Sequence, residues 1–466
     1  MILLNLIIKP VWIFGIDRQV QIHVGAAVYG KYFALMSLVY IFNILLDIGI
    51  SNYANRHIAA DITTVPAIFG NGIAAKALLS FIYTIVIVII AKGSGINDNR
   101  LLLSLIMIQI LSSLLLFGRG IVSALQLFKT DAFLSVTDRT LLIFMAGLWL
   151  YTSLFKKVFT IYDFAWLQVV TIASTLVICF FVLLKKKVFS RIVLDKAGIY
   201  EIVKQSLPFA LTVFFMGLHN RTDAFLLERL HKNGPSEAGI YAAAYRLLDA
   251  ANMIGYLFAA MLVSYWSKHV TEKQVLKKSL LFSHQLLIPS GILLATVSIF
   301  LNQRIYLLLY HHTNEYGGEI LRLCLIAIVP YFITHIYGTM LTATGNIKTY
   351  MWIVLFSAII NITTNSLLIP VWGAKACVTI SLCSQSLLAV LTILFVKKQT
   401  GLSVGAILWF KYFVVAAAIA VSLMLLGNTR IGIWATLISI TCIWIVMMNL
   451  LQIFSIRSFL KLMNEK

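Results

Sequence analysis

Long, uninterrupted apolar blocks dominate this sequence and decide what kind of fold it can adopt. The block at 101–118 reads LLLSLIMIQILSSLLLFG and contains no charged residue. Blocks of this kind are about 18–25 residues long, the length of an α-helix that crosses the hydrocarbon core of a bilayer. Backbone amides and carbonyls find no water in that core, so each block must be a helix. We therefore predict an all-α integral membrane protein.

The overall composition agrees with this prediction. Hydrophobic residues make up 61% of the 466 residues and charged residues 12%, whereas soluble domains carry roughly twice that charged fraction. A net charge of +20 would suggest nucleic-acid binding in a soluble protein. Here the basic residues lie mainly in short connections between apolar blocks, where they set orientation and contact anionic headgroups. We expect membrane lipids, and no nucleic acid, as partners.

Fourteen apolar segments are predicted to span the membrane. The N-terminal segment lacks the basic region and the small-residue cleavage site of a signal peptide, so we interpret it as the first span. The first and seventh segments contain charges and fit the pattern least well. The distribution of Lys and Arg among the connections favours cytoplasmic N- and C-termini. The predicted spans lie near 2–20, 30–49, 72–91, 101–118, 134–154, 163–184, 206–228, 243–264, 281–302, 319–341, 350–370, 374–396, 409–426 and 431–454.

A basic segment at 185–205, KKKVFSRIVLDKAGIYEIVKQ, separates the sixth and seventh spans. It is typical of an amphipathic stretch on the cytoplasmic surface. The two flanking regions resemble each other, because GAAVYGKYFALMS (25–37) aligns with EAGIYAAAYRLLD (237–249). Internal repeats build the two lobes of many transporters. We predict two pseudo-symmetric six-helix lobes, with an N-lobe at 1–184, a linker at 185–205, a C-lobe at 206–398, and two further spans with a cytoplasmic tail at 399–466.

Charged residues inside the predicted spans are few, and they concentrate in the first two spans of each lobe. A charge at the bilayer centre costs about 2.5–3.5 kcal/mol, so such side chains must face protein or water. A cavity between the lobes would remove this cost, and its excess of cations would suit an anionic headgroup. The residues predicted to bind substrate are Lys9, Asn220, Arg221, Asp223, Arg246 and Asp249. The residues predicted to serve ion coupling or gating are Asp17, Arg18, Asn43, Asp47 and Glu228.

Simpler structural roles stay open for several of these residues. Arg246 and Asp249 are three positions apart, a spacing that also fits a salt bridge within one helix. Asp17 with Arg18, and Glu228 with Arg229, also fit interfacial pairs at span ends. Further charges lie nearer the ends of predicted spans, where long side chains reach water, so the sequence assigns them no role. These include Lys76, Asp138, Arg139, Glu319, Arg322 and Lys411.

Sequence motifs of covalent chemistry are not found. The sequence contains no GxxxxGK[ST] loop for nucleotide phosphates and no HExxH pair for zinc. All five cysteines lie inside apolar blocks, where they pack as small hydrophobic side chains. We therefore expect a transporter rather than an enzyme, with no cofactor and no metal.

Three segments carry a resemblance to a known family. The run opening the second span contains Gly25, Tyr29 and Gly30, and the segment FGRGIVSALQLFKTDAFLSV lies at 117–136. Near the seventh and eighth spans stand the motif residues Asn220, Arg221, Asp223, Gly239, Tyr241, Ala244, Tyr245 and Arg246. These segments resemble the polysaccharide-exporter branch of the multidrug/oligosaccharidyl-lipid/polysaccharide exporter superfamily, which includes O-antigen and capsule repeat-unit flippases.

The resemblance implies a cationic cavity between two lobes, with two extra C-terminal helices as in some members. It implies alternating access that loads an undecaprenyl-pyrophosphate-linked oligosaccharide at the cytoplasmic face of the bacterial inner membrane and releases it at the periplasmic face. Surface-polysaccharide polymerases and other assembly proteins would be partners. Two alternatives stay open: a cation-coupled multidrug exporter of the same superfamily, and a membrane-embedded polysaccharide polymerase or ligase.

Overall fold

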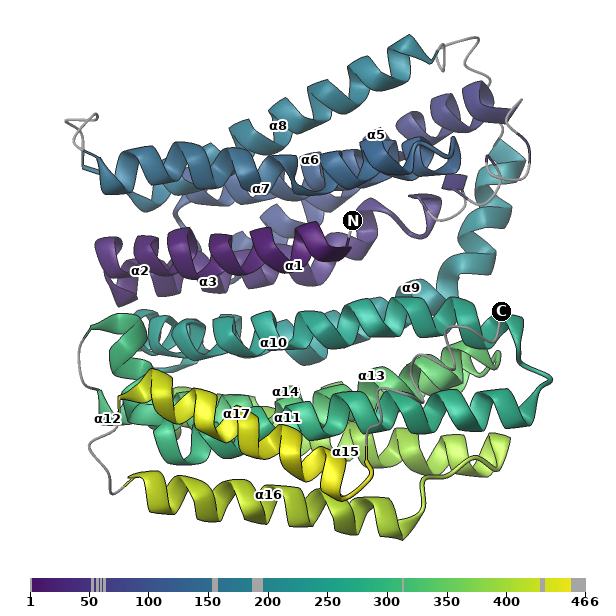
Figure 1. The fold of residues 1–466 in the computed structure, drawn as a ribbon. Coiled ribbons are helices and arrows are strands. Elements are labelled where there is room, and N and C mark those ends of the chain that lie inside the picture. Colours follow the sequence, from purple (N-terminus) through teal and green to yellow (C-terminus); the bar gives the residue numbers. More distant parts are fainter. Residues whose placement is uncertain are drawn as a thin grey trace. The chain divides into compact units, whose positions relative to one another are not determined.

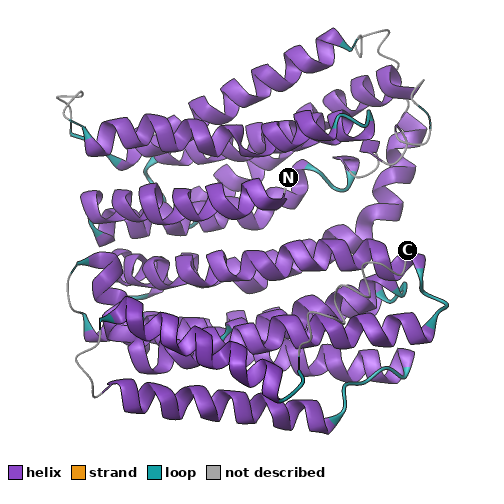
Figure 2. Cartoon of the chain, viewed as in Figure 1, coloured by secondary structure: helices purple, strands orange, loops and turns teal. Residues whose placement is uncertain are grey.

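The computed structural model describes residues 2–453 apart from 52–53, 56–57, 59–60, 62–63, 153–157, 187–195, 312–313 and 428–431. Within these residues every regular element is a helix (Figure 1 and Figure 2). The elements are α1 (Ile2–Pro10), η1 (Val11–Asp17), α2 (Arg18–Val24), α3 (Ala26–Ile41), η2 (Phe42–Leu46), α5 (Val65–Gly93), α6 (Asn99–Ala124), α7 (Phe128–Tyr151), α8 (Ile161–Lys185), α9 (Lys196–Leu230), α10 (Gly234–Lys268), α11 (Lys273–Tyr310), α12 (Glu315–Ile326), α13 (Ile328–Ala343), α14 (Ile347–Trp372), α15 (Ala374–Thr400), α16 (Ala406–Gly427) and α17 (Ile433–Leu450).

Twelve helical segments of the described chain are long and apolar enough to cross a membrane. They correspond to twelve of the fourteen predicted spans. The other two predictions, the first and seventh spans, are also helical: α1, η1 and α2 follow one another without interruption, and α9 is 35 residues long. Both contain charged residues, which lower their mean hydropathy. The all-α membrane fold with about fourteen span-length helices is confirmed.

The chain divides into two compact units, Met1–Gly239 and Ile240–Lys466. The first unit contains α1 to α9, the second contains α11 to α17, and α10 begins in the first and continues in the second. The lobe boundaries predicted from the sequence stay a prediction. Residues 187–195 of the predicted linker lie outside the described residues, whereas α9 already begins at Lys196 and runs on into the predicted seventh span.

In the first unit, α6 packs against α8 and α3 packs against α9. Glycines permit both approaches. Gly118 on α6 lies against the sulfur of Cys179 on α8, and Gly217 on α9 lies against the backbone of Ile41 on α3. The Phe42 and Phe214 rings pack beside the second contact, with centroids 5.7 Å apart and planes tilted by 52°. Small residues at helix contacts are a recurring feature of membrane proteins, because they let backbones approach closely.

Two spans of the first unit depart from α-helical geometry. After Pro10 the first span continues as a π-helix, η1. Proline has no N–H to donate and its ring displaces the preceding turn, so a local change of winding is expected there. The second span narrows into the 3-10 helix η2, and the chain then turns through Ile48 and Gly49, with φ of 41° and 87°. Both irregular stretches carry residues that the sequence singled out.

In the second unit α11 packs against α12, α13 and α16. The contact with α16 includes His284, whose Nδ1 lies 3.0 Å from the hydroxyl of Tyr412. The two rings stack with centroids 5.5 Å apart, and Trp409 meets the imidazole edge-on. The imidazole is fully buried. This polar contact therefore anchors the first of the two C-terminal spans to the rest of the unit.

Replacing Tyr412 with Phe should lower the free energy of unfolding in detergent micelles by about 1–2 kcal/mol, because a buried imidazole nitrogen loses its hydrogen-bond partner. Thermal or denaturant unfolding of the purified protein measures the change. Tyr265→Phe is the matched control, since the Tyr265 ring is 41% exposed. Equal stability of the Tyr412 variant and the parent would mean that this bond contributes nothing to docking of α16.

Candidate functional site

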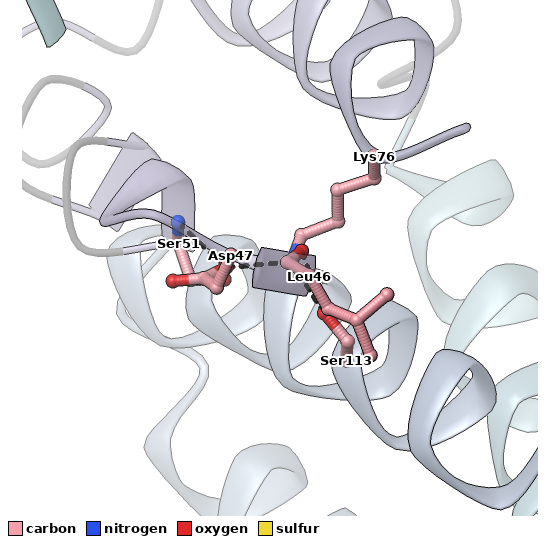
Figure 3. Close-up of polar contacts among 5 residues, drawn as sticks. All are labelled: Leu46, Asp47, Ser51, Lys76 and Ser113. Carbon is pink, nitrogen blue, oxygen red and sulfur yellow. Dashed lines mark hydrogen bonds and ion pairs between the residues drawn. The ribbon is translucent and has the colours of Figure 1, made fainter. Parts of the chain in front are cut away.

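A deeply buried charge of the first unit belongs to Lys76 on α5, drawn with its polar partners in Figure 3. Lys76 is 1% exposed. Its ammonium group donates to Asp47 Oδ1 at 2.6 Å, to Ser113 Oγ at 2.8 Å and to the carbonyl oxygen of Leu46 at 3.1 Å. An ammonium group has three donors, and here each has an acceptor. The Phe117 ring lies beside it, with its centroid 5.7 Å from Nζ. The charge is therefore fully solvated by protein groups.

The irregular second span creates these acceptors. The Leu46 carbonyl lies at the end of η2, where a continuous α-helix would have used it, and it also accepts from Ser113 Oγ at 3.0 Å. Asp47 follows it directly and accepts from Ser51 Oγ at 2.5 Å. The Asp47 side chain keeps 19% of its surface exposed. Lys76 therefore donates to the carbonyl that the break in the second span leaves free. Of the two charged groups, the Asp47 carboxylate is the one that solvent or a ligand can reach.

This arrangement corrects one interpretation of the sequence. We expected the Lys76 side chain to reach water near the end of a span, and this expectation is wrong, because α5 begins at Val65 and Lys76 lies well inside it. Asn43, predicted to share a role with Asp47, donates instead to Gln109 Oε1 at 2.8 Å. The assignment of Asn43 and Asp47 to ion coupling or gating stays a prediction.

The acidic residues near the ends of the first and seventh predicted spans have two different environments. Asp17 is buried and accepts from the hydroxyl of Tyr29 at 2.8 Å, so its partner comes from the second span. Arg18 is half-buried beside it. Glu228 forms an ion pair with the adjacent Arg229 at 2.7 Å. The Glu228 contact agrees with the simpler interpretation as an interfacial pair, whereas the Asp17 contact is a buried interhelical bond.

The polar run of α9 lies where this helix packs against α3. The guanidinium carbon of Arg221 is 5.1 Å from the centroid of the Tyr40 ring. His219 and Asp223 are each 1% exposed, and His219 Nδ1 is 3.1 Å from the side-chain oxygen of Asn220. Arg221 itself is half-buried. The aromatic ring beside it restricts the orientation of the guanidinium group and leaves part of it accessible.

A third charged group lies along the first span. Lys9 is half-buried, and Asp138, Arg139 and Arg119 are charged neighbours that act on it electrostatically. The guanidinium carbon of Arg139 is 4.3 Å from the centroid of the Trp12 ring. The sequence predicted a role for Lys9 and none for Arg139. The structure places both on adjacent elements of the same unit.

In the second unit, Arg246 is buried and donates to the hydroxyl of Tyr310 at 3.1 Å. The Tyr310 hydroxyl in turn donates to the carbonyl oxygen of Ala243, also at 3.1 Å. Asp249 is half-buried on the same helix. Because Arg246 and Asp249 belong to the second unit and the other predicted residues to the first, a single cavity between lobes stays a prediction.

The second unit also contains a network of uncharged polar side chains that the sequence did not predict. His335 Nε2 lies 2.8 Å from the Asn252 side-chain oxygen, and Gln385 donates to Thr334 at 3.2 Å. Asn361 donates to Ser384 at 3.1 Å and accepts from Asn365 at 3.3 Å. The sequence signal for these contacts is the presence of amide and imidazole side chains within apolar blocks. The sequence prediction depended on charged residues alone. Among the described residues no group of three or more His, Cys, Asp or Glu could hold a metal ion.

Many apolar helices, irregular spans and buried ionic groups are features of polytopic membrane transporters. The model of the family described as "Polysaccharide biosynthesis protein" matches residues 19–270, and the chain belongs to this family. No curated protein sequence matches it significantly.

Solved structures extend the similarity to nearly the whole chain. The lipid II flippase MurJ in an inward closed conformation matches with a TM-score of 0.69 and 15% identity, covering 97% of this chain and 98% of that one. An inward-facing multidrug resistance MATE family transporter of the MOP superfamily matches with a TM-score of 0.61 and 15% identity, covering 86% and 94%. These similarities establish the fold. The resemblance to the multidrug/oligosaccharidyl-lipid/polysaccharide exporter superfamily is confirmed.

Proposed function

We propose that the protein is a flippase that moves a lipid-linked oligosaccharide repeat unit, carried on undecaprenyl pyrophosphate, from the cytoplasmic to the periplasmic face of a bacterial inner membrane. The observation that carries the proposal is the match to a polysaccharide biosynthesis family across residues 19–270. A surface polysaccharide assembled from such units needs its polar precursor to cross the bilayer. Transport by alternating access, without covalent chemistry, meets this need on a transporter fold.

The charges of the first unit support an anionic substrate. Arg221 and Lys9 are cations inside spans, and neither is wholly buried. Guanidinium groups bind phosphate oxygens through two parallel hydrogen bonds, which suits Arg221 to a pyrophosphate. In our proposal Asn220, Asp223, Arg246 and Asp249 complete the substrate site. Both termini lie in the cytoplasm, and a polysaccharide polymerase receives the transported unit.

A second candidate function is export of cationic drugs, which the fold match to a multidrug resistance MATE family transporter favours. Such a transporter needs a carboxylate that can exchange a cation or proton. Asp47 is the carboxylate of the irregular second span, but its Oδ1 already accepts from Lys76 and Ser51. An additional cation would compete with a buried ammonium group. We therefore rank this function second.

Deletion of the gene should leave lipid-linked oligosaccharide on the cytoplasmic face of the membrane, and the parent gene should restore its transfer. The Arg221→Ala variant should restore transfer about tenfold less well, because one charge-assisted contact to phosphate is lost. Enzymatic labelling of accessible sugars in oriented membrane vesicles measures both faces. Lys232→Ala, two residues beyond the end of α9, is the matched control, because the Lys232 side chain is exposed.

Two outcomes would contradict parts of this proposal. Equal distribution of the lipid-linked sugar in the deletion strain and the parent would reject the flippase and favour drug export. Full restoration by Arg221→Ala at normal membrane levels would reject the role of Arg221 while leaving transport itself in place.

A further inference from the structure

A cluster of charged residues surrounds Lys9 in the first unit, and among its charged members the sequence predicted a role for Lys9 alone. We call it the Lys9 cluster and define it as Lys9, Trp12, Arg119, Asp131, Asp138 and Arg139. The first two residues flank the start of the π-helix η1, and the others belong to α6 and α7. Contacts run along the whole boundary of α7 with the first span, from Asn5 with Ser135 at 3.1 Å to Tyr151 with the carbonyl of Gly15 at 2.7 Å.

The position of Asp138 and Arg139 deep within a span makes their ionised forms costly in free energy. Helix α7 covers Phe128–Tyr151, so Arg139 is its twelfth residue of 24. At 1.5 Å per residue, the ends of the helix are about 16 Å and about 18 Å away. An ionised side chain at such a depth is expensive and is by default a candidate for function. The sequence had placed Arg139 near the start of a span, because the predicted boundary was six residues too late.

The charges of the Lys9 cluster do not balance. Arg119 pairs with Asp131 at 2.8 Å, and Arg139 contacts Asp138 at 3.5 Å. Asp138 attracts the Lys9 ammonium group, whereas Arg139 and Arg119 repel it. Three cations therefore face two carboxylates, with one positive charge in excess. An anion is the ligand that would remove this excess.

The geometry also favours access to the cations. The Arg139 side chain is 30% exposed, compared with 16% for Asp138. Trp12 lies against the Arg139 guanidinium group, and its indole Nε1 is buried with no hydrogen-bond partner among the described residues. Stacking on an aromatic face fixes a guanidinium group while its in-plane N–H groups stay available. The π-helix brings Trp12 to this place, and π-helical turns are frequent at functional sites.

We propose that the Lys9 cluster binds phosphate groups of the transported lipid within the first unit, in addition to Arg221. Lys9 and Arg139 contact the phosphate oxygens, and Trp12 is a positioning residue that orients Arg139. This inference rests on the proposed function, because it assumes a phosphate-bearing lipid as substrate. Asp138 opposes binding, since its carboxylate competes for the same cations.

Binding of undecaprenyl pyrophosphate to the purified full-length protein in detergent tests the proposal, with undecaprenol as the neutral lipid and inorganic pyrophosphate as the free anion. Arg139→Gln and Lys9→Gln should each weaken binding of undecaprenyl pyrophosphate about tenfold, as expected for loss of one charge-assisted contact. Asp138→Asn should strengthen it several-fold, a gain that misfolding cannot produce. Trp12→Leu should weaken binding, and Arg139→Lys should restore part of the loss seen with Arg139→Gln. Arg100→Gln, at the start of α6 and outside the cluster, should bind like the parent.

The outcomes separate this inference from the proposed function. Parent-like binding by Arg139→Gln and Lys9→Gln would overturn the cluster's role and leave the flippase proposal standing. If Asp138→Asn weakens binding as much as Arg139→Gln does, the role of the cluster would also be overturned, because the Asp138–Arg139 pair would then be structural. A parent that binds undecaprenol as tightly as undecaprenyl pyrophosphate would reject both proposals. If the parent binds inorganic pyrophosphate but not undecaprenyl pyrophosphate, the cluster is a site for a free anion, and the lipid substrate is rejected.

Discussion

Replacing Asp47 with Asn should lower the free energy of unfolding by about 3–5 kcal/mol, because it leaves a buried ammonium group without its counter-charge. Lys76 is 1% exposed, so the stranded charge cannot move into water without disturbing α5. The double variant Asp47→Asn with Lys76→Met should recover most of the loss, since it removes the charge as well. Unfolding in detergent micelles, followed for the parent, both single variants and the double variant, measures the coupling between the two side chains.

An exposed ion pair of the same chain is the matched control. Glu319 and Lys375 lie 2.8 Å apart, but their side chains are 32% and 47% exposed. Glu319→Gln should therefore change stability by less than about 1 kcal/mol. If the double variant at Asp47 and Lys76 is no more stable than Asp47→Asn, the loss comes from the turn after η2 and the buried pair is not its cause.

Replacing Gly30 with Ala should be the second large effect, with a loss of about 3 kcal/mol or more, beyond the usual cost of overpacking. A Cβ at this position would overlap the carbonyl oxygen of Pro235 and lie 2.6 Å from the amide nitrogen of Gly239. Both neighbours are backbone, so no side chain can rotate away. Gly239 faces the backbone of Ala26 in the same way, and its carbonyl accepts from Gln21 at 2.9 Å.

The start of α10 is therefore held directly against α3, and separation of these helices should also reduce transport. Gly93→Ala is the control, because a Cβ at Gly93, the last residue of α5, would meet nothing within 4 Å. It should leave stability unchanged or raise it slightly, as helix propensity predicts. A parent-like unfolding midpoint for Gly30→Ala would show that the two helices separate without cost.

The helical membrane fold could be predicted because apolar block length is a local property of the sequence. The break at Pro10 also had a local signal, since proline cannot continue the hydrogen-bond pattern. The 3-10 stretch Phe42–Leu46 had none, because its residues are those of an ordinary apolar helix. Asp47 and Lys76 lie 29 positions apart in the sequence, and such a pairing needs the tertiary structure.

The predicted site depended on counting charges and on where each span was thought to begin. It pointed to Lys9 and Arg221, which lie inside helices of the first unit and are not fully buried, and their role in substrate binding stays a prediction. It undervalued Arg139, because the sequence places the start of its span at 134 whereas α7 starts at Phe128. It missed His335 and Gln385, since neutral side chains carry no penalty large enough to stand out in a sequence.

In the π-helix of the first span, the number of residues should matter more than the type of each residue. Bonds from i to i+5 advance the chain by a smaller rotation per residue than α-helical bonds, so side chains before and after η1 follow different registers. Lys9 can therefore face α7 while Asp17 meets Tyr29 on α3. A change of residue type within Val11–Asp17 alters one contact. A change in length by a single codon would rotate every side chain on one side of the segment, so insertions and deletions there should be tolerated less than substitutions.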